Sequence, residues 1–431
     1  MAHIVIIGNG ISGITAARHI RKRSDDRITV ISGESEHFFS RTALMYIYMG
    51  HMRYEHTKPY EDHFWTKNRI ELKNGWVKQV DSPGKQLHLA DGSTLAYDSL
   101  IIATGSRSNM FGWPGQDLPG VQGLYSLQDL ELMERNTRGV SSAVIVGGGL
   151  IGVEMAEMLH TRGIHVTFLV REDAFWSNIL PREEADLIGR HLRDHGVDLR
   201  FGSELDEILA DANGRACAVR TKAGEEIPCQ FVGLTAGVHP NIDFLKDGSG
   251  IATDKGVLVN EFLETNVPDV YGIGDCAQFH QHPDPQRRPI EQVWYTGRIM
   301  GETVARTITG DRTAYAPGNW FNSAKFFDIE YQTYGWVRSK LNDDEADHYW
   351  EHPDGDKALH FVWERNSRIL RGVNAFGIRL RHEVFDRWLN ERVTVDHVIT
   401  QLEDAAFDPE FYERMEPLLR ASFPSPKTVP V

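Results

Sequence analysis

The chain has 431 residues, of which 41% are hydrophobic and 25% charged, and its formal net charge is −15. This composition excludes a disordered chain, and no apolar run reaches the roughly 18 residues that a membrane helix needs. The acidic balance disfavours affinity of the whole surface for nucleic acid, because the phosphate backbone would be repelled. At roughly 100–200 residues per domain, the length indicates two to four domains.

The N-terminus and the cysteines indicate the compartment. The chain enters an apolar run at residues 4–7, which leaves no room for a secretory signal. The three cysteines form no C-x-x-C pair, so neither a disulfide framework nor a zinc ribbon is expected. His280 and His282 lie in a proline-containing segment, and we interpret them as solvated loop residues rather than metal ligands. We therefore expect a cytoplasmic protein without a metal site.

A dinucleotide-binding pattern opens the chain. Residues 3–7 form a continuous apolar strand, and a G-x-G-x-x-G sequence then leads into an alanine-rich helix. Such glycines permit a tight turn, close approach of the backbone to a pyrophosphate, and close packing of helix on strand. The helix N-terminus adds free N–H groups and the positive end of the helix dipole. The candidate cofactor-binding residues here are Gly8, Gly10, Ile11, Ser12 and Gly13.

The same pattern returns after residues 142–146, which form a second apolar strand. A single G-x-G-x-x-G can be merely a tight strand-to-helix turn. Two copies, each between a strand and a helix, favour two dinucleotide-binding units. The candidate residues of the second copy are Gly147, Gly149, Leu150, Ile151 and Gly152.

An acid about 20 residues beyond the last glycine of such a turn binds ribose hydroxyls. Glu34 takes this place after a second strand, residues 27–32, although a solvated loop carboxylate is the alternative. In the second unit the corresponding strand ends at Val170, and Arg171 follows. A guanidinium suits a 2′-phosphate, so we expect NADPH rather than NADH. A solvated loop cation is the alternative for Arg171.

The remaining chain predicts a third domain. Residues 76–102 indicate an antiparallel meander that leads into a buried strand, and residues 213–234 form a similar set. After residue 315 aromatic residues become dense, with helices expected at 382–390 and 394–402 and a loosely ordered tail after Phe423. The sequence thus predicts an α/β fold with two Rossmann-like dinucleotide-binding domains and a C-terminal α+β domain. The expected boundaries are 1–115 with 241–314, then 116–240, then 315–431.

Two dinucleotide units followed by a third domain resemble the flavoproteins of the pyridine nucleotide-disulfide oxidoreductase superfamily. Residues 102–107 resemble that family's A-T-G segment, residues 237–241 its G-x-x-P-N segment, and residues 270–277 its second flavin motif. The resemblance implies that the first unit binds FAD and the second binds NADPH or NADH. It also implies further cofactor-binding candidates: Val77, Ala103, Thr104, Gly105, Gly237, Gly274 and Asp275, the last toward the ribityl chain.

The branch of the superfamily is indicated by a missing thiol. Disulfide reductases carry a redox-active cysteine pair, or a single cysteine, after the first acidic residue, whereas residues 37–44 contain none. A thiol relay is therefore unavailable. The segment instead resembles the Y-x-R-P-x-L stretch of ferredoxin and rubredoxin reductases and of flavoproteins like apoptosis-inducing factor. Arg41 and Leu44 match, while Thr42 replaces the proline, and Arg41 joins the FAD-binding candidates.

The resemblance also points to three residues near the reaction. Residues 318–332 partly match the branch's W-F-W-S-D-Q-Y segment, which places Trp320 at the flavin edge; a core aromatic is the alternative. Glu154 takes the place of a glutamate that often pairs with a lysine beside the flavin N5, but Tyr46 stands at the lysine's position. A buried unpaired carboxylate would be protonated or would need another partner. The alternative for Glu154 is an exposed residue near the helix N-terminus.

The resemblance implies an FAD-dependent NAD(P)H oxidoreductase that passes hydride to flavin and electrons on to a small carrier such as a ferredoxin or rubredoxin. An NAD(P)H oxidase or small-molecule reductase, and a redox-sensing flavin/NAD-binding protein, stay open as alternatives. No nucleic-acid or membrane partner is expected, and a homodimer is an option.

Because ferredoxins and this chain are both acidic, docking of such a carrier would need a local basic surface. Solvated strand residues are an equal alternative for the candidate arginines. These are Arg365, Arg368, Arg371, Arg379 and Arg381.

Overall fold

The computed structural model describes residues 1–246, 248–407, 410 and 414–424. They form two compact units. Unit 1 comprises Met1–Val140, Ala210–Ala216 and Gln230–Pro317, and unit 2 comprises Ser141–Leu209, Cys217–Cys229 and Gly318–Val431. This division by compactness differs from the three expected domains, whose boundaries stay a prediction. Most of the proline-rich tail lies outside the described residues.

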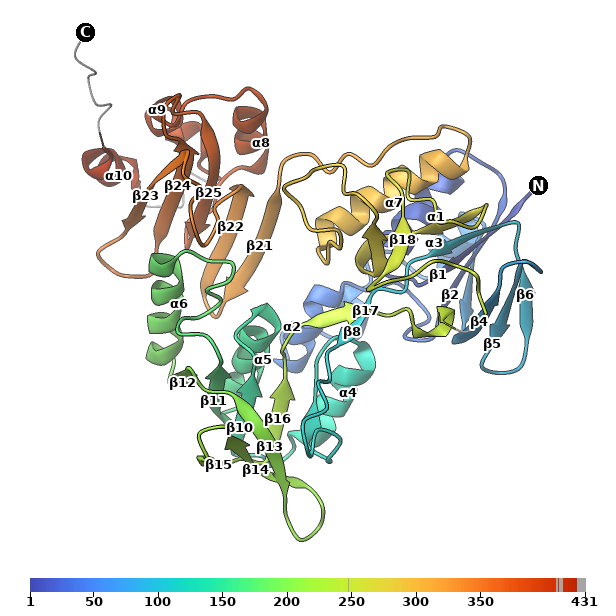
Figure 1. Cartoon of the computed structure of the whole chain (residues 1–431), viewed down its shortest axis with the longest axis horizontal. Helices are drawn as coiled ribbons and strands as arrows, with labels where there is room; N and C mark the ends of the chain where they lie inside the picture. Colours follow the sequence, from blue (N-terminus) through green and yellow to red (C-terminus); the bar gives the residue numbers. More distant parts are fainter. Residues whose placement is uncertain (247, 408–409, 411–413, 425–431) are drawn as a thin grey trace. The chain divides into compact units, whose positions relative to one another are not determined.

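Unit 1 is built on a five-stranded parallel sheet of order β19-β7-β1-β2-β3 (Figure 1). Its central strands are continuous apolar runs, as expected for parallel strands buried on both faces. Val5, Ile6 and Ile101, for example, have no exposed surface. The strands are β1 (His3–Ile7), β2 (Arg27–Ser32), β3 (Ile70–Asn74), β7 (Ser99–Ile102) and β19 (Val270–Gly272). The two strands expected here, at residues 3–7 and 27–32, have the predicted bounds.

Two helices pack closely beside this sheet. Helix α1 (Ile11–Arg21) connects β1 to β2, and α7 (Trp294–Ile308) lies against it (Figure 1). Two glycines one turn apart permit the close approach. A Cβ on Gly297 would lie 2.6 Å from Ser12 Oγ, and a Cβ on Gly301 would lie 2.5 Å from the Ser12 carbonyl oxygen. The start of α7 is therefore held beside the first glycine-rich turn.

Smaller elements complete unit 1. The meander forms as predicted, from β4 (Val77–Asp81), β5 (Gln86–Leu89) and β6 (Thr94–Ala96). Strand β8 (Ser106–Ser108) pairs antiparallel with β17 (Val238–Pro240). Strand β9 (Val121–Gln122) runs parallel to β16 (Phe231–Leu234). Strand β18 (Val257–Val259) runs parallel to β20 (Ala277–Phe279). The short helices are α2 (Leu44–Tyr48), α3 (His63–Lys67) and α4 (Leu127–Asn136).

Unit 2 begins with a second parallel set of strands. Strand β10 (Ser142–Val146) pairs with β11 (His165–Val170), which pairs with β12 (Asp198–Phe201). Helix α5 (Leu150–Thr161) connects β10 to β11, and α6 (Arg182–Asp194) connects β11 to β12. The strands β13 (Leu205–Ala210), β14 (Ala216–Thr221) and β15 (Glu226–Pro228) form a small sheet.

The C-terminal part of unit 2 is an antiparallel sheet of order β21-β22-β25-β24-β23. Its strands are β21 (Phe321–Phe326), β22 (Ile329–Gly335), β23 (Glu345–Glu351), β24 (Ala358–Glu364) and β25 (Leu370–Phe376). Helices α8 (His382–Asn390), α9 (Val395–Thr400) and α10 (Glu416–Ser422) follow (Figure 1). Phe385 and Trp388 of α8 join Phe361 and Val373 of the sheet in one core. The helix predicted at 394–402 is shorter, because a 3-10 turn, Leu402–Ala405, takes over its end.

A buried polar row joins α6 to this sheet. Glu184 of α6 and His360 of β24 have exposed fractions of 0% and 1%, and 2.8 Å separates Glu184 Oε1 from His360 Nδ1. His360 Nε2 lies 2.8 Å from Asp347 Oδ2, and Asn374 Nδ2 donates to Glu184 Oε2 over 2.8 Å. Tyr331 Oη donates to Asn374 Oδ1 over 3.3 Å, so every polar side-chain atom of Glu184, His360 and Asn374 has a partner.

Within the described ranges, no helix combines the length and the apolar character that crossing a membrane requires.

Candidate cofactor sites

The three glycines of the first turn occupy three different environments. Gly8 has φ +113°, and a Cβ there would lie 2.1 Å from the Ala103 carbonyl oxygen. A Cβ on Gly13 would lie 2.1 Å from the Gly8 carbonyl oxygen, so this glycine permits close packing of helix on strand. A Cβ on Gly10 would meet no atom within 4 Å. The turn therefore has an open face at Gly10, beside the uncapped N-terminus of α1, and this fits a dinucleotide pyrophosphate.

Other predicted FAD-binding segments converge on this turn. Ala103 N–H donates to the Ile7 carbonyl over 2.8 Å, and a Cβ on Gly274 would lie 2.3 Å from Ser12 Oγ. Thr104 Oγ1 donates to the Asn241 carbonyl over 2.7 Å, and Asn241 N–H donates to the Gly105 carbonyl over 2.9 Å. The structure thus brings three segments that are far apart in sequence to one edge of the parallel sheet.

Asp275 lies half-buried next to these segments. Its Oδ2 accepts hydrogen bonds from Tyr125 Oη over 3.1 Å and from Ser106 Oγ over 3.4 Å. Burial raises the pKa of the Asp275 carboxyl, while the hydrogen bond from Tyr125 and the nearby Arg41 charge oppose that shift. Burial also raises the pKa of the Tyr125 hydroxyl, which therefore stays a donor. Sequence reasoning missed Tyr125, because no motif marks it.

Glu34 is held by a bidentate ion pair. Arg41 Nη1 and Nη2 donate to its two carboxylate oxygens over 2.7 and 2.6 Å, and Leu127 N–H at the start of α4 donates over 2.9 Å. Burial alone would lower the pKa of Arg41, but Glu34 raises it, so the guanidinium stays charged. The Glu34 side chain is only 16% exposed. The structure joins two predicted FAD-binding residues, and the solvated-carboxylate alternative does not hold.

We expect Glu34→Ala to weaken FAD binding, because two charge-assisted hydrogen bonds to ribose, each contributing about 1.5–3 kcal/mol, would be lost. The dissociation constant can be measured from the quenching of FAD fluorescence. Glu34→Gln is the matched control, because it keeps the side-chain length and one acceptor oxygen but removes the negative charge that pairs with Arg41. Unchanged FAD affinity in Glu34→Ala would contradict the assignment.

The second glycine-rich turn, in unit 2, has the same features as the first. Gly147 has φ +115°, a Cβ on Gly149 would meet no atom within 4 Å, and α5 starts at Leu150 without a side-chain cap. A Cβ on Gly148 would lie 2.7 Å from Val170 Cγ1, so the buried end of β11 closes against this turn. A nucleotide phosphate fits here as it does in unit 1.

Arg171 follows the buried strand end and points to solvent. Its side chain is 71% exposed, and Nη2 donates to Glu172 Oε1 over 2.8 Å. The structure places no carboxylate at the strand end itself, where Val170 has no exposed surface. Arg171 is accessible to an anion, although Glu172 partly balances its charge.

Glu154 on α5 is half-buried. Burial and then the neighbouring Glu157 carboxylate raise its pKa to about 7. Glu157 itself is buried and accepts from Lys325 Nζ of β21 over 2.7 Å. Sequence reasoning missed Lys325. A lysine thus does enter this acidic pair of α5, from the C-terminal sheet rather than from the position of Tyr46.

The other two predicted catalytic residues have aromatic neighbours. Tyr46 belongs to α2 in unit 1, where its ring stacks on His51 with centroids 6.1 Å apart. Trp320 precedes β21 in unit 2 and stacks on Trp336, with centroids 5.2 Å apart and ring planes 11° apart. Trp320 is half-buried, so the fully buried core alternative does not hold. Its place at a flavin edge stays a prediction.

One expectation about the histidines was wrong. His282 is buried, with its Nε2 3.2 Å from Glu291 Oε2, because it packs against Phe279 and Tyr315; His280 is exposed as expected. The arginines expected in a basic docking surface each have an acidic partner or a backbone acceptor, and their role in docking stays a prediction. The contacts are Arg368–Asp396, Arg371–Glu364, Arg379–Glu330 and Arg381–Glu383, while Arg365 donates to the Glu345 carbonyl.

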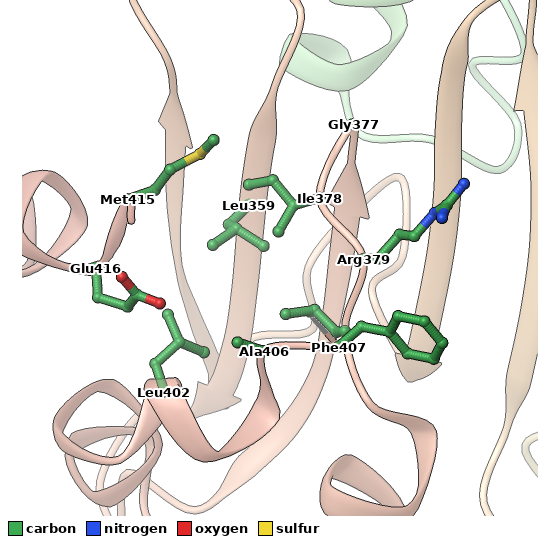
Figure 2. Close-up of a pocket in the computed structure, with 10 residues that line it drawn as sticks. Leu359, Gly377, Ile378, Arg379, Leu402, Ala406, Phe407, Met415 and Glu416 are labelled. Atoms are coloured by element: carbon green, nitrogen blue, oxygen red, sulfur yellow. The ribbon is translucent and has the colours of Figure 1, made fainter. Parts of the chain in front are cut away.

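The C-terminal sheet also borders a small, mainly apolar pocket. Figure 2 shows Leu359, Ile378, Leu402 and Met415 around it, with Glu416 at one side. No predicted cofactor-binding or catalytic residue lines this pocket.

A family model described as pyridine nucleotide-disulphide oxidoreductase matches residues 2–301. The chain belongs to this family. The predicted fold class, the enzyme class of FAD-dependent NAD(P)H oxidoreductase, and the cofactors FAD and NAD(P)H are thereby confirmed.

Relatives agree with this assignment, and a solved structure shares the fold. Rhodocoxin reductase of Rhodococcus erythropolis is 30% identical over 334 residues, which cover 75% of this chain and 76% of that protein. The ferredoxin–NAD(+) reductase subunit of a benzene 1,2-dioxygenase system from Pseudomonas putida is 28% identical over 323 residues, covering 74% and 77%. The ferredoxin reductase for the CYP199A2 system of Rhodopseudomonas palustris has a TM-score of 0.81 at 24% identity, covering 98% and 100% of the two chains.

Proposed function

We propose that this oxidoreductase passes electrons from NAD(P)H to a small protein carrier of the ferredoxin or rubredoxin type. The observation that carries the proposal is the absence of a thiol where a disulfide reductase needs one. Residues 33–48, which follow the FAD-binding strand β2, contain no cysteine. Cys276, beside Asp275, is fully buried, and burial raises its pKa, so it cannot act as a reactive thiolate.

Relatives support the same direction. The Pseudomonas putida relative is named as a ferredoxin reductase subunit, and a relative from Acinetobacter baylyi is named rubredoxin-NAD(+) reductase. Both names describe one-electron protein acceptors rather than disulfides.

The described side chains have separate tasks in this reaction. Bound flavin supplies the change from two-electron transfer at nicotinamide to one-electron transfer at the carrier. The open faces at Gly10 and Gly149 would receive the two pyrophosphates at helix N-termini. Asp275 and Glu34 would accept hydrogen bonds from the ribityl and ribose hydroxyl groups of FAD, and Arg41 balances the charge of Glu34. Glu154, with a pKa of about 7, can hold or release a proton near neutral pH.

The proposal is tested by turnover with different acceptors. We expect NAD(P)H-dependent reduction of a [2Fe–2S] ferredoxin or a rubredoxin, rapid turnover with ferricyanide, and slow consumption of oxygen. Rapid oxygen consumption without carrier reduction would favour an oxidase. A protein that is reduced once by NAD(P)H but does not turn over even with ferricyanide would favour a redox sensor.

We further propose that NADPH is preferred over NADH. The strand-end position that would hold a ribose-binding acid is the buried, apolar Val170, and the exposed Arg171 guanidinium stands next to it. An acid at the strand end would repel a 2′-phosphate, and a guanidinium can bind one through two hydrogen bonds.

Arg171→Ala is expected to lower kcat/KM for NADPH roughly 10–100-fold, which corresponds to about 1.5–3 kcal/mol of charge-assisted hydrogen bonding, and to leave NADH nearly unchanged. Glu172→Gln is the matched control, because it removes the carboxylate that pairs with Arg171 and should raise the preference for NADPH. Steady-state kinetics with both donors checks this. Equal losses for the two donors, or a native enzyme that favours NADH, would refute the role of Arg171.

A further inference from the structure

A cluster of two histidines and an aspartate lies in unit 2. His191 lies in the last turn of α6, His195 caps the C-terminus of that helix, and Asp328 lies in the tight turn between β21 and β22. One ligand atom from each of the three lies within 4.8 Å of those of the other two. His191 Nε2 is 2.5 Å from Asp328 Oδ1, and His195 Nε2 is 3.6 Å from the same oxygen.

The hydrogen bonding of His195 fixes which nitrogen faces the cluster. Its Nδ1 lies 2.9 Å from the His191 carbonyl oxygen, which can only accept, so Nδ1 carries the proton. The Nε2 lone pair therefore points toward Asp328. This arrangement, in which one ring nitrogen donates to a backbone carbonyl and the other is free, is the usual state of a metal-binding imidazole.

The surroundings hold the imidazoles in place. The Phe327 ring packs on His195 with centroids 4.8 Å apart, and the His160 ring contacts both Phe327 and His195. Asp328 is 75% exposed, whereas His191 is 12% exposed, so the carboxylate is the member that can adjust.

The spacing suits a tetrahedral ion. Ligand atoms about 2.0–2.1 Å from a tetrahedral centre are about 3.3 Å from one another. The two measured separations, 3.6 and 2.5 Å, lie on either side of this value. A small movement of the exposed Asp328 carboxylate would equalise them.

We propose that His191, His195 and Asp328 form a binding site for a divalent transition-metal ion such as Zn²⁺. Two imidazole nitrogens and one carboxylate oxygen are ligands that Zn²⁺ accepts, while Mg²⁺ requires an oxygen shell. Water would complete the coordination. The ion would replace the proton between His191 and Asp328 and fasten α6 to the β21–β22 turn.

A second histidine–acid group provides a control. His352, Asp354 and Asp356 also approach one another between β23 and β24. Here His352 Nδ1, 3.4 Å from Asp354 Oδ2, already accepts the Asp354 N–H over 3.2 Å, and both acids are exposed. This pattern is typical of a hydrogen-bonded turn, so it is not proposed as a metal site.

The test uses tag-free, FAD-loaded protein that has been treated with EDTA and desalted. Zn²⁺ affinity is measured by competition with a chromophoric chelator, and thermal unfolding is followed with and without Zn²⁺. We expect one site per chain and a rise in Tm of about 5–10 °C at 100-fold excess of Zn²⁺ over Kd. His191→Gln, His195→Gln and Asp328→Asn should each weaken binding at least ~10-fold.

Two variants serve as matched controls. His160→Gln changes a neighbouring histidine outside the ligand set, and Asp354→Asn changes the second group; both should bind Zn²⁺ like the native protein. Retention of the FAD spectrum and of Tm in EDTA shows that each variant is folded. The proposal is overturned if the native protein shows no saturable Zn²⁺ binding, if Mg²⁺ competes equally, or if the His195→Gln and Asp354→Asn effects are interchanged. These readouts do not depend on turnover, so they stand apart from the proposed electron transfer.

Discussion

The Gly8→Ala variant is expected to be about 2–6 kcal/mol less stable than the native protein. A methyl group at Gly8 would lie 2.1 Å from the Ala103 carbonyl oxygen, so either β1 or β7 must shift. Overpacking of this kind costs about 1–3 kcal/mol, and holding a non-glycine residue at φ +113° adds about 1–3 kcal/mol. A loss of this size is a large part of the free energy of unfolding of a typical protein, which is roughly 5–15 kcal/mol.

Gly10→Ala separates stability from cofactor binding. A Cβ at Gly10 meets nothing within 4 Å, so this variant should unfold at nearly the native denaturant concentration. It should nevertheless bind FAD more weakly, because the added methyl group keeps the pyrophosphate from the backbone. Chemical denaturation and FAD titration of both variants distinguish the two effects. If Gly8→Ala were as stable as Gly10→Ala, the close approach of β1 to residue 103 would not be a constraint.

Removal of Glu184 is the second change with a large expected effect. Glu184→Ala would leave His360 and Asn374 buried without their shared partner. Breaking a buried charge pair costs about 3–5 kcal/mol, because the remaining group keeps its desolvation penalty. The free energy of unfolding of Glu184→Ala, of His360→Leu and of the double variant forms a thermodynamic cycle. We expect the double variant to be more stable than the sum of the single losses implies.

The same row gives a pH dependence with a definite sign. Burial alone would lower the pKa of His360, but its hydrogen bonds to Asp347 and Glu184 raise it to about 9, above its usual value of 6.5. The folded state then binds the proton more tightly than the unfolded state. The resulting stability is present in full below pH 6.5 and is lost as pH rises through about 9. His360→Gln should lack this loss between pH 7 and 9.5, as thermal unfolding across that range can show.

Local pattern predicted the parts of the fold that depend on neighbouring residues. The strands 27–32 and 165–170 and the helix 382–390 have the expected bounds, because their apolar period or continuous burial is written in adjacent positions. The three glycine roles at Gly8, Gly10 and Gly13 were likewise readable, since each follows from the geometry of a strand-to-helix turn.

Partners that are distant in sequence could not be predicted in this way. Tyr125 reaches Asp275, Lys325 reaches Glu157, and His360 reaches Glu184 only after the sheets have formed. Charge counts also ignore neighbours, so the arginines of the C-terminal sheet read as a basic surface although each has an acceptor. His282 shows the same limit for burial, because its proline-rich context says nothing of Phe279 and Tyr315.

Helix α6 makes the C-terminal sheet a poor candidate for exchange between homologous reductases. Three of its side chains are matched to that sheet, through Glu184–His360, Arg190–Glu351 and His191–Asp328. A chimera joined at residue 317 would pack a sheet from another protein against the fully buried Glu184 carboxylate, which would no longer have His360 as its partner. Recombination that transfers residues 182–194 together with 318–431 would keep these pairs intact. The segments that have to be exchanged together are therefore discontinuous in sequence.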